Sequence, residues 1–335
     1  MSRISFGIFI LILILLPVVL SDNYFVHVLT VCCIYAVLVS SWDILSGYGG
    51  LFSFGHPIFF GLGGYVSALL AMKLGISPWI GLFIGAASAS LIGFLVGLPV
   101  LRLKGSYLAI VTLSFMIIAH QVCTHWTSLT QGPTGLSGIP NLPNIDAFGI
   151  HVNFDGINRT PYYWMAAVIL VLSTLIQMKF VNSATGIHLM AIREDEDAAQ
   201  AVGINTARCK LTAFVLTSFL AGMVGGFYGN FMTLLSPGVF GFDVMITTMT
   251  MSLIGGAGTT FGPIVGAFVL TFIAEFFKEF GDIHLFLYGL FIIFGIIFMP
   301  QGILKSFWQK VRFGKICDYI KRRVAGMRGN ELSNR

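Results

Sequence analysis

The sequence predicts an all-α, polytopic membrane protein with about ten transmembrane helices and no soluble domain. Of its 335 residues, 56% are hydrophobic and only 10% are charged. Soluble domains carry about 25% charged residues, so this chain has too few charges to cover a water-facing surface. Its 39 glycines suit helices that approach each other closely through small residues. A water-soluble globular fold is therefore excluded.

Ten apolar runs are candidate spans, since a helix of about 20 residues crosses the hydrocarbon core of a bilayer. They are residues 4–20, 24–45, 57–73, 79–99, 106–126, 161–180, 209–234, 243–257, 264–278 and 284–300. The first run follows Arg3, as a secretory signal would, but no small-residue cleavage site precedes Asp22, which favours a retained helix. The runs 243–257 and 264–278 are short, so we expect them to be tilted, broken or re-entrant.

The distribution of basic residues predicts the orientation in the membrane. With the N-terminus inside and ten crossings, only Lys73, Arg159 and Lys278 of the 19 Lys and Arg residues lie outside. Basic residues concentrate in the cytoplasmic loops of membrane proteins, so both termini are expected in the cytoplasm. The pattern is typical of a multi-pass protein of the bacterial inner membrane.

The predicted organisation is one transmembrane domain over residues 1–304 and a basic cytoplasmic tail over 305–335. Two connecting loops are long. Residues 127–160 are rich in Gly and Pro and face outside, whereas residues 181–208 face inside and carry the densest charge cluster. The tail is expected to rest on anionic lipid headgroups.

The inside loop has the pattern of one amphipathic helix within residues 183–205. The apolar residues that recur at helical spacings are Leu189, Ile192, Ala199 and Val202. Such a helix lies either at the membrane surface or in a groove of another protein. Its other surface is mostly acidic, which suits an anionic membrane poorly, so the pattern favours a protein partner.

The same loop resembles the cytoplasmic coupling helix of the branched-chain amino-acid ABC transporter permeases, G-x-x-L-x-A-I-R-E-[DN]-E-x-A-A-x-x-x-G-I. The matching positions that we expect to couple to an ATPase are Gly186, Leu189, Ile192, Arg193, Glu194, Asp195, Glu196, Ala198, Ala199 and Gly203. The sequence departs at Ile187, His188 and Met190, where the family is often basic. The resemblance implies that this helix fits a cleft in the ATPase and transmits its closure to the membrane.

Four further stretches extend the resemblance over nearly the whole chain. They are GYGGLFSFGHPIFFGLGGY at 47–65, RLKGSYLAIVTLSF at 102–115, QGPTGLSGIP at 131–140 and GGAGTTFGPIVGA at 255–267. Glycine- and proline-rich segments of this kind predict either broken backbone that lines a cavity or close helix packing through small residues. Transporters place substrate near broken helices, so the two Gly-rich segments at 47–57 and 255–263 are candidates for the translocation path.

The expected site residues come from these segments. The candidates for the translocation path are Asp43, Gly47, Gly50, Ser53, Gly55, His56, Gly255, Gly256, Gly258, Thr259, Gly262 and Pro263. The candidates for the loop that meets a substrate-binding protein are Gly132, Gly135, Leu136, Gly138 and Pro140. Ionisable groups inside spans are costly and are functional candidates by default, which singles out Asp43, His56 and Glu275.

No motif for catalysis, a cofactor or a metal is evident. The stretch GGAGTTFGP lacks the Gly-Lys-Ser/Thr of a phosphate loop, so the chain is not expected to hydrolyse ATP itself. Five scattered cysteines suggest neither a disulfide framework nor a metal site. We expect no enzyme activity, no cofactor and no nucleic-acid partner.

The expected function is import of branched-chain or other hydrophobic amino acids by alternating access. The resemblance implies four kinds of partner: two cytoplasmic ABC ATPase subunits, a second related permease, a periplasmic substrate-binding protein and the lipid bilayer. One alternative is a permease for urea, short amides or simple sugars in the same superfamily. Another, from a different class, is a stand-alone ion-coupled carrier or a membrane-embedded enzyme. An ion-coupled carrier should show paired buried carboxylates or an internal repeat, and the sequence shows neither clearly.

Overall fold

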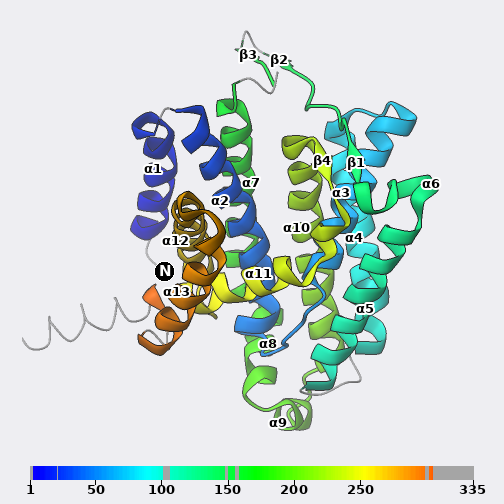
Figure 1. Cartoon of the computed structure of the whole chain (residues 1–335). Coiled ribbons are helices and arrows are strands. Elements are labelled where there is room, and N and C mark those ends of the chain that lie inside the picture. The colour runs from blue at the N-terminus through cyan, green and yellow to red at the C-terminus, as the bar shows by residue number, and fades with distance from the viewer. Residues whose placement is uncertain are drawn as a thin grey trace, which may run out of the picture.

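The computed structural model describes residues 3–20, 22–100, 106–147, 150–154, 158–298 and 302–304, and each of the ten apolar runs forms a helix there (Figure 1). These helices are α1 (Arg3–Val19), α2 (Asn23–Asp43), α3 (His56–Leu74), α4 (Pro78–Val100), α5 (Ser106–His125), α7 (Thr160–Val181), α10 (Thr206–Met232), α11 (Phe242–Gly255), α12 (Gly262–Phe277) and α13 (His284–Phe298). The start of the 102–115 motif and the predicted basic tail at 305–335 lie outside the described residues.

The helices confirm an all-α, polytopic membrane protein. In the part of the chain that the structure describes, six helices are long and apolar enough to cross a membrane: α2 with its extension, α3, α4, α5, α7 and α10. Helices α1, α11, α12 and α13 are shorter, at 14 to 17 residues. The two runs expected to be broken correspond to α11 and α12, and Figure 1 shows α11 running across the bundle rather than along it.

Shorter elements join the helices and close the two ends of the bundle. They are the π-helix η1 (Ile44–Tyr48), α6 (Thr127–Thr130), η2 (Gly132–Thr134), α8 (Ala184–Glu194), α9 (Glu196–Ala201), η3 (Pro237–Phe240) and η4 (Lys278–Ile283), with the strands β1 (Leu136–Ser137), β2 (Ile145–Ala147), β3 (Ile150–Val152) and β4 (Leu234–Leu235). Strand β1 pairs antiparallel with β4, and β2 with β3. Figure 1 shows α8 and α9 at one end of the bundle and β2 and β3 at the opposite end.

Glycines bring the backbones of α3, α4 and α10 into direct contact at the centre of the bundle. A Cβ atom added to Gly63 on α3 would overlap the backbone of Gly222 on α10. One added to Gly225 on α10 would overlap the carbonyl group of Phe60. This packing is the small-residue packing that the glycine content predicts, because lipid-solvated helices associate mainly through close van der Waals contact.

The outer faces of the helices carry large apolar side chains. Phe83 and Leu91 on α4 and Ile110 and Ile118 on α5 are all exposed on the surface of the chain. Water-soluble monomers rarely expose apolar surface on this scale. The interior instead holds hydroxyl groups, such as that of Thr30, which donates to the carbonyl of Val26 one turn earlier at 2.8 Å. This distribution fits a chain whose solvent is the hydrocarbon of a bilayer.

Candidate functional site

The centre of the candidate site is the buried carboxylate at the end of α2. The helix continues past Asp43 as the π-helix η1, a form that often marks functional positions. Asp43 is fully buried, and its Oδ1 accepts hydrogen bonds from the Ser252 hydroxyl at 2.8 Å and from the Gly258 amide at 2.9 Å. Charge-assisted hydrogen bonds of this kind are strong, so Asp43 ties α2 to α11 and to the segment after it.

The two Gly-rich segments meet at this carboxylate. A Cβ atom added to Gly47 would lie within 3.0 Å of both the Asp43 carboxylate and the Gly258 amide nitrogen. Gly258 has a φ of +70°, which side chains rarely adopt, and it follows the end of α11 at Gly255. The break expected between the short helices is therefore present, and glycine is required on both sides of the contact. We call this contact between residues 43–50 and 255–262 the Gly junction.

Helix α8 packs directly on the Gly junction. The Arg193 guanidinium donates a hydrogen bond from Nη1 to the carbonyl of Gly47 at 2.7 Å. The side chain of Leu189 is buried beside Gly49, where an added Cβ would lie 3.1 Å from its Cγ. Gly50, with a φ of +66°, leaves room for the Arg193 stem, because a Cβ atom added there would lie only 2.8 Å from the Arg193 Cγ. The structure thus brings together two groups of candidates, the loop positions and the Gly-rich positions, which the sequence presents as separate.

The inside loop contains two helices, which corrects the expectation of one. Asp195 is extended, with φ −158° and ψ 113°, and its side chain accepts hydrogen bonds from the amides of Asp197 and Ala198 at 2.9 and 3.0 Å. It therefore caps α9 and ends α8, and a short polar side chain favours such a cap over a helix interior. At the start of the loop, Ser183 caps α8 by accepting a hydrogen bond from the Gly186 amide at 3.3 Å.

The apolar stripe of this loop faces its own chain, which corrects the expectation that it enters a partner's groove. Leu189, Ile192 and Ala199 are buried, and only Val202 is exposed, at 78%. A salt bridge holds the second half of the loop in place, since the Glu196 carboxylate lies 2.6 Å from the Lys210 ammonium on α10, and Lys210 is itself buried. The apolar stripe packs the loop against the helix bundle, so a different surface of the loop faces outward.

The remaining path candidates stabilise the two broken segments. Ser53 accepts two hydrogen bonds. Its backbone carbonyl accepts one from the Trp42 indole at 2.8 Å, and its side-chain hydroxyl accepts one from the Gly55 amide at 3.2 Å. His56 begins α3, is fully buried and meets Phe59 edge to face.

The loop between α11 and α12 is ordered in a similar way. The Thr259 hydroxyl donates to the carbonyl of Gly256 at 2.7 Å and accepts from the amide of Gly262 at 3.0 Å. Pro263 stands in the first turn of α12, where its missing N–H is no loss. These side chains stabilise the break itself.

The outer-loop candidates separate into anchors and accessible positions. Gly132, Gly135 and Leu136 are buried, and Leu136 pairs with Leu235 just after α10. Gly138 is exposed, as is Pro140. The loop is therefore fixed at the end of α10 by Leu136 and by the amides of Gly138 and Ile139, which donate to the carbonyl of Thr233, and it exposes Gly138 and Pro140 to the surroundings.

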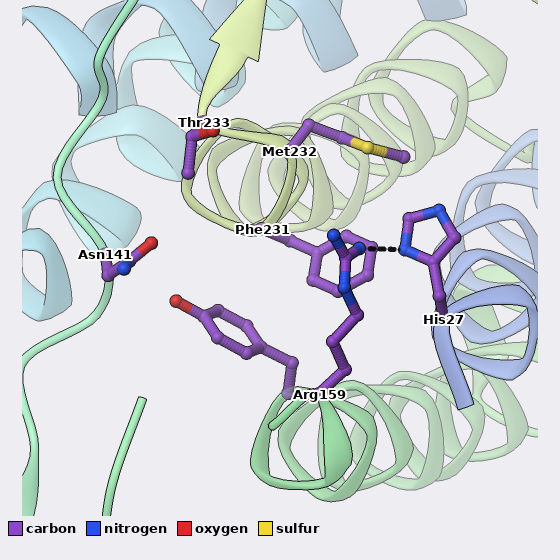
Figure 2. Close-up of a pocket in the computed structure, with 7 residues that line it drawn as sticks. His27, Asn141, Arg159, Phe231, Met232 and Thr233 are labelled. Atoms are coloured by element: carbon purple, nitrogen blue, oxygen red, sulfur yellow. Dashed lines mark hydrogen bonds between the residues drawn. The ribbon is translucent and has the colours of Figure 1, made fainter. Parts of the chain in front are cut away.

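Sequence reasoning missed a cavity near the outer loop. It is lined by His27, Asn141, Arg159, Tyr162, Phe231, Met232 and Thr233 (Figure 2). The sequence presented Arg159 only as a basic residue outside the membrane and gave no signal for His27. An arginine directly before an apolar span was the available signal. Among the described residues, no group of three His, Cys, Asp or Glu side chains is placed to hold a metal ion.

The structure is a bundle of membrane helices that is broken at a buried glycine junction, and a loop helix packs on this junction. This arrangement defines a transport subunit of the permease type. The chain belongs to the family described as the permease component of the branched-chain amino acid transport system, which matches residues 24–298. It is therefore a transport subunit and not an enzyme.

Several permeases from bacteria and archaea are similar to this chain. The high-affinity branched-chain amino acid transport system permease protein LivM of Escherichia coli strain K12 is 32% identical over 298 residues, covering 83% of this chain and 69% of the relative. The LivH permease protein of Salmonella typhimurium is 26% identical, covering 81% of this chain and 91% of the relative. A probable LivM of Methanocaldococcus jannaschii is 24% identical over 267 residues, covering 70% and 75%. No solved structure matches the chain.

Proposed function

We propose that this chain is one of two permease subunits of an ATP-binding-cassette importer for branched-chain or other hydrophobic amino acids. A second, related permease completes the membrane part. Relatives named LivM and LivH both align with most of this chain, which supports a pair of similar subunits. The importer lies in the bacterial inner membrane with both termini of this chain in the cytoplasm, as its distribution of basic residues supports.

The hydrogen bond from Arg193 to Gly47 is the observation that carries the proposal. Helix α8 lies outside the long spans, yet its Arg193 and Leu189 are fixed to the Gly junction. Asp43 in turn fixes that junction to α11. A displacement of α8 therefore moves both broken segments together. ATP-driven closure of the ATPase subunits is transmitted by this route, and the bundle alternates between its two access states.

The ATPase subunits bind the outward surface of the inside loop. Its exposed residues include Ile187, Glu194, Asp197, Ala198 and Val202. Two aliphatic side chains framed by carboxylates fit an apolar cleft with a basic rim, because complementary charge steers and orients such a contact. At the opposite end, the substrate-binding protein meets the exposed positions Gly138 and Pro140 of the outer loop.

Co-purification tests the docking surface. We expect an ATPase subunit to co-purify with the wild-type chain from detergent-solubilised membranes and to be lost from a Glu194→Lys, Val202→Asp double variant. Both side chains are exposed, at 79% and 78%, so the variant should remain folded. The matched control is Thr127→Asp with Ser128→Lys in α6, towards the other end of the bundle, and it should keep the ATPase.

Other outcomes distinguish the alternatives. If the wild-type chain purifies alone and still transports, the proposal fails, and an ion-coupled carrier using Asp43, His56 or Glu275 takes its place. If leucine uptake by the complex is absent but urea, a short amide or a simple sugar is imported, the substrate class is wrong while the ATPase coupling stands.

A further inference from the structure

Two adjoining cavities lie between α2, α7, α10, α11, α12 and α13. The first has a volume of about 240 Å³ and is the one in Figure 2. The second has a volume of about 360 Å³. Both are lined by His27 and Met232, so they meet at these two side chains. Together they lie within the range of about 300–1,000 Å³ that small-molecule sites occupy.

The first cavity contains a cation without a carboxylate partner among the described ion pairs. Arg159 stands at the start of α7 and donates a hydrogen bond to the Nδ1 of His27. Its guanidinium carbon lies 5.4 Å from the ring centroid of Phe231, and that ring stacks on His27. Figure 2 shows the guanidinium in the space between Asn141 and His27. Because a guanidinium has five N–H donors, donors remain for a ligand carboxylate.

The second cavity has hydrogen-bond acceptors at one side, beside the Lys278 side chain that also lines it, and an apolar wall. Glu275 on α12 accepts hydrogen bonds from the Tyr24 hydroxyl and, at 2.6 Å, from the exposed ammonium of Lys278. A carboxylate has about four acceptor sites, so two remain. The buried hydroxyl of Thr271 also lines this cavity, and apart from the nearby Cys32 thiol it has no hydrogen-bond partner among the described residues.

The apolar part of the second cavity is lined by aliphatic, aromatic and thioether side chains. They are Val28, Val31, Tyr35, Tyr228, Met232, Met251 and Tyr288. Methionine side chains adapt to irregular aliphatic shapes, so this lining accommodates more than one branched side chain. The paired cavity therefore presents a cation, an acceptor pair and an apolar wall around the shared side chain of His27.

We propose that the paired cavity is a binding site for a zwitterionic, hydrophobic amino acid within this subunit. Arg159 binds the α-carboxylate, Glu275 and Thr271 bind the α-ammonium, and the apolar wall takes the side chain. The inference rests on the proposed function, since it gives the imported amino acid a site in this chain. It also explains why Arg159 is placed against His27 and Phe231 rather than against a carboxylate of the protein.

The test measures direct binding to the purified permease–ATPase complex without the substrate-binding protein. The ligands are leucine, leucinol, which lacks the carboxylate, and 4-methylpentanoate, which lacks the ammonium. We expect the wild-type complex to bind leucine at least tenfold more tightly than either analogue, the range of a hydrogen bond to a charged group. Arg159→Gln should remove the preference for leucine over leucinol and leave the preference over 4-methylpentanoate. Glu275→Gln should have the opposite effect.

A matched control and the complex's own activity make the outcomes decisive. Lys73→Gln removes a cation that does not line either cavity and that, among the described residues, donates to the Ser128 carbonyl, so both preferences should persist. If the variants keep ATPase activity and leucine import but the wild-type preferences are unchanged in Arg159→Gln and Glu275→Gln, the site is wrong and the proposed function stands. If the wild-type complex neither binds nor imports any hydrophobic amino acid, the proposed substrate fails together with the site.

Discussion

Replacement of Arg193 by alanine separates ATP hydrolysis from transport if α8 transmits movement to the Gly junction. The variant removes the hydrogen bond to the carbonyl of Gly47 and the stem that fills the space beside Gly50. It leaves the buried Leu189 unchanged and alters the outward surface of the loop only at Arg193 itself, whose side chain is 46% exposed and lies 3.7 Å from the Glu194 carboxylate. We therefore expect the variant to fold, to retain its ATPase subunits and to hydrolyse ATP, while it imports less amino acid for each ATP consumed.

The magnitude follows from the geometry of this single contact. A hydrogen bond to a charged group contributes about 1.5–3 kcal/mol. The Arg193 side chain is 46% exposed, so solvent screening reduces the net contribution to about 1 kcal/mol. A change of this size alters the coupling equilibrium about fivefold. Import per ATP should fall by about that factor, and the thermal midpoint should change by less than about 4 °C.

The assay reconstitutes the complex in proteoliposomes and measures leucine uptake and phosphate release in parallel. Arg208→Ala is the matched control, because Arg208 is an exposed arginine close to the same loop and, among the described residues, its side chain is not in contact with the Gly junction. Its ratio of uptake to hydrolysis should equal that of the wild type. An unchanged ratio in Arg193→Ala, with the protein folded and assembled, would refute coupling through this contact.

The other predictions concern stability and packing. Gly47→Ala places a Cβ against Asp43 and Gly258, so overpacking should lower the stability by about 1–3 kcal/mol, read as a reduced unfolding midpoint in detergent. Lys210→Ala leaves Glu196 without its cation, and breaking a largely buried pair in this way costs about 3–5 kcal/mol, measured as lost stability of the solubilised chain.

Each of these predictions has its own comparison. Gly7→Ala is the control for the first, since an added Cβ there meets nothing within 4 Å, and equal midpoints for the two variants would contradict the packing argument. For the second, a Lys210→Met, Glu196→Gln double variant removes both charges and should recover most of the stability. If the double variant is no more stable than Lys210→Ala, the loss of stability does not come from leaving the Glu196 charge without its partner.

The membrane fold was predictable because its signal is local and repeated. Most of the apolar runs are long, and their boundaries are set by polar residues or prolines, so the positions of these helices follow from hydropathy. The break between α11 and α12 was predictable for a similar reason, since Gly255, Gly256 and Gly258 exclude a continuous helix at that point. Such signals need no knowledge of what the segment contacts.

The loop between α7 and α10 shows where the local signal fails. Helical spacing predicted an apolar stripe, and its members Leu189, Ile192 and Ala199 are buried, but spacing does not say which surface covers them. The end of α8 at Asp195 could not be predicted either, because a run of acidic residues is equally compatible with a solvated helix face and with a helix cap. The Arg193–Gly47 contact joins residues 146 positions apart in the sequence, and nothing in either segment predicts that they meet.

Helix α10 has a consequence for how the two faces of the membrane communicate. Its 27 residues measure about 40 Å, more than the roughly 30 Å of hydrocarbon that a span must cross. At one end Lys210 holds α9, and just past the other end Leu235 pairs with the outer loop. The inside loop and the outer loop are thus both attached to one continuous helix. An event at either face reaches the other as a tilt or shift of the whole helix, without a chain of intermediate side chains.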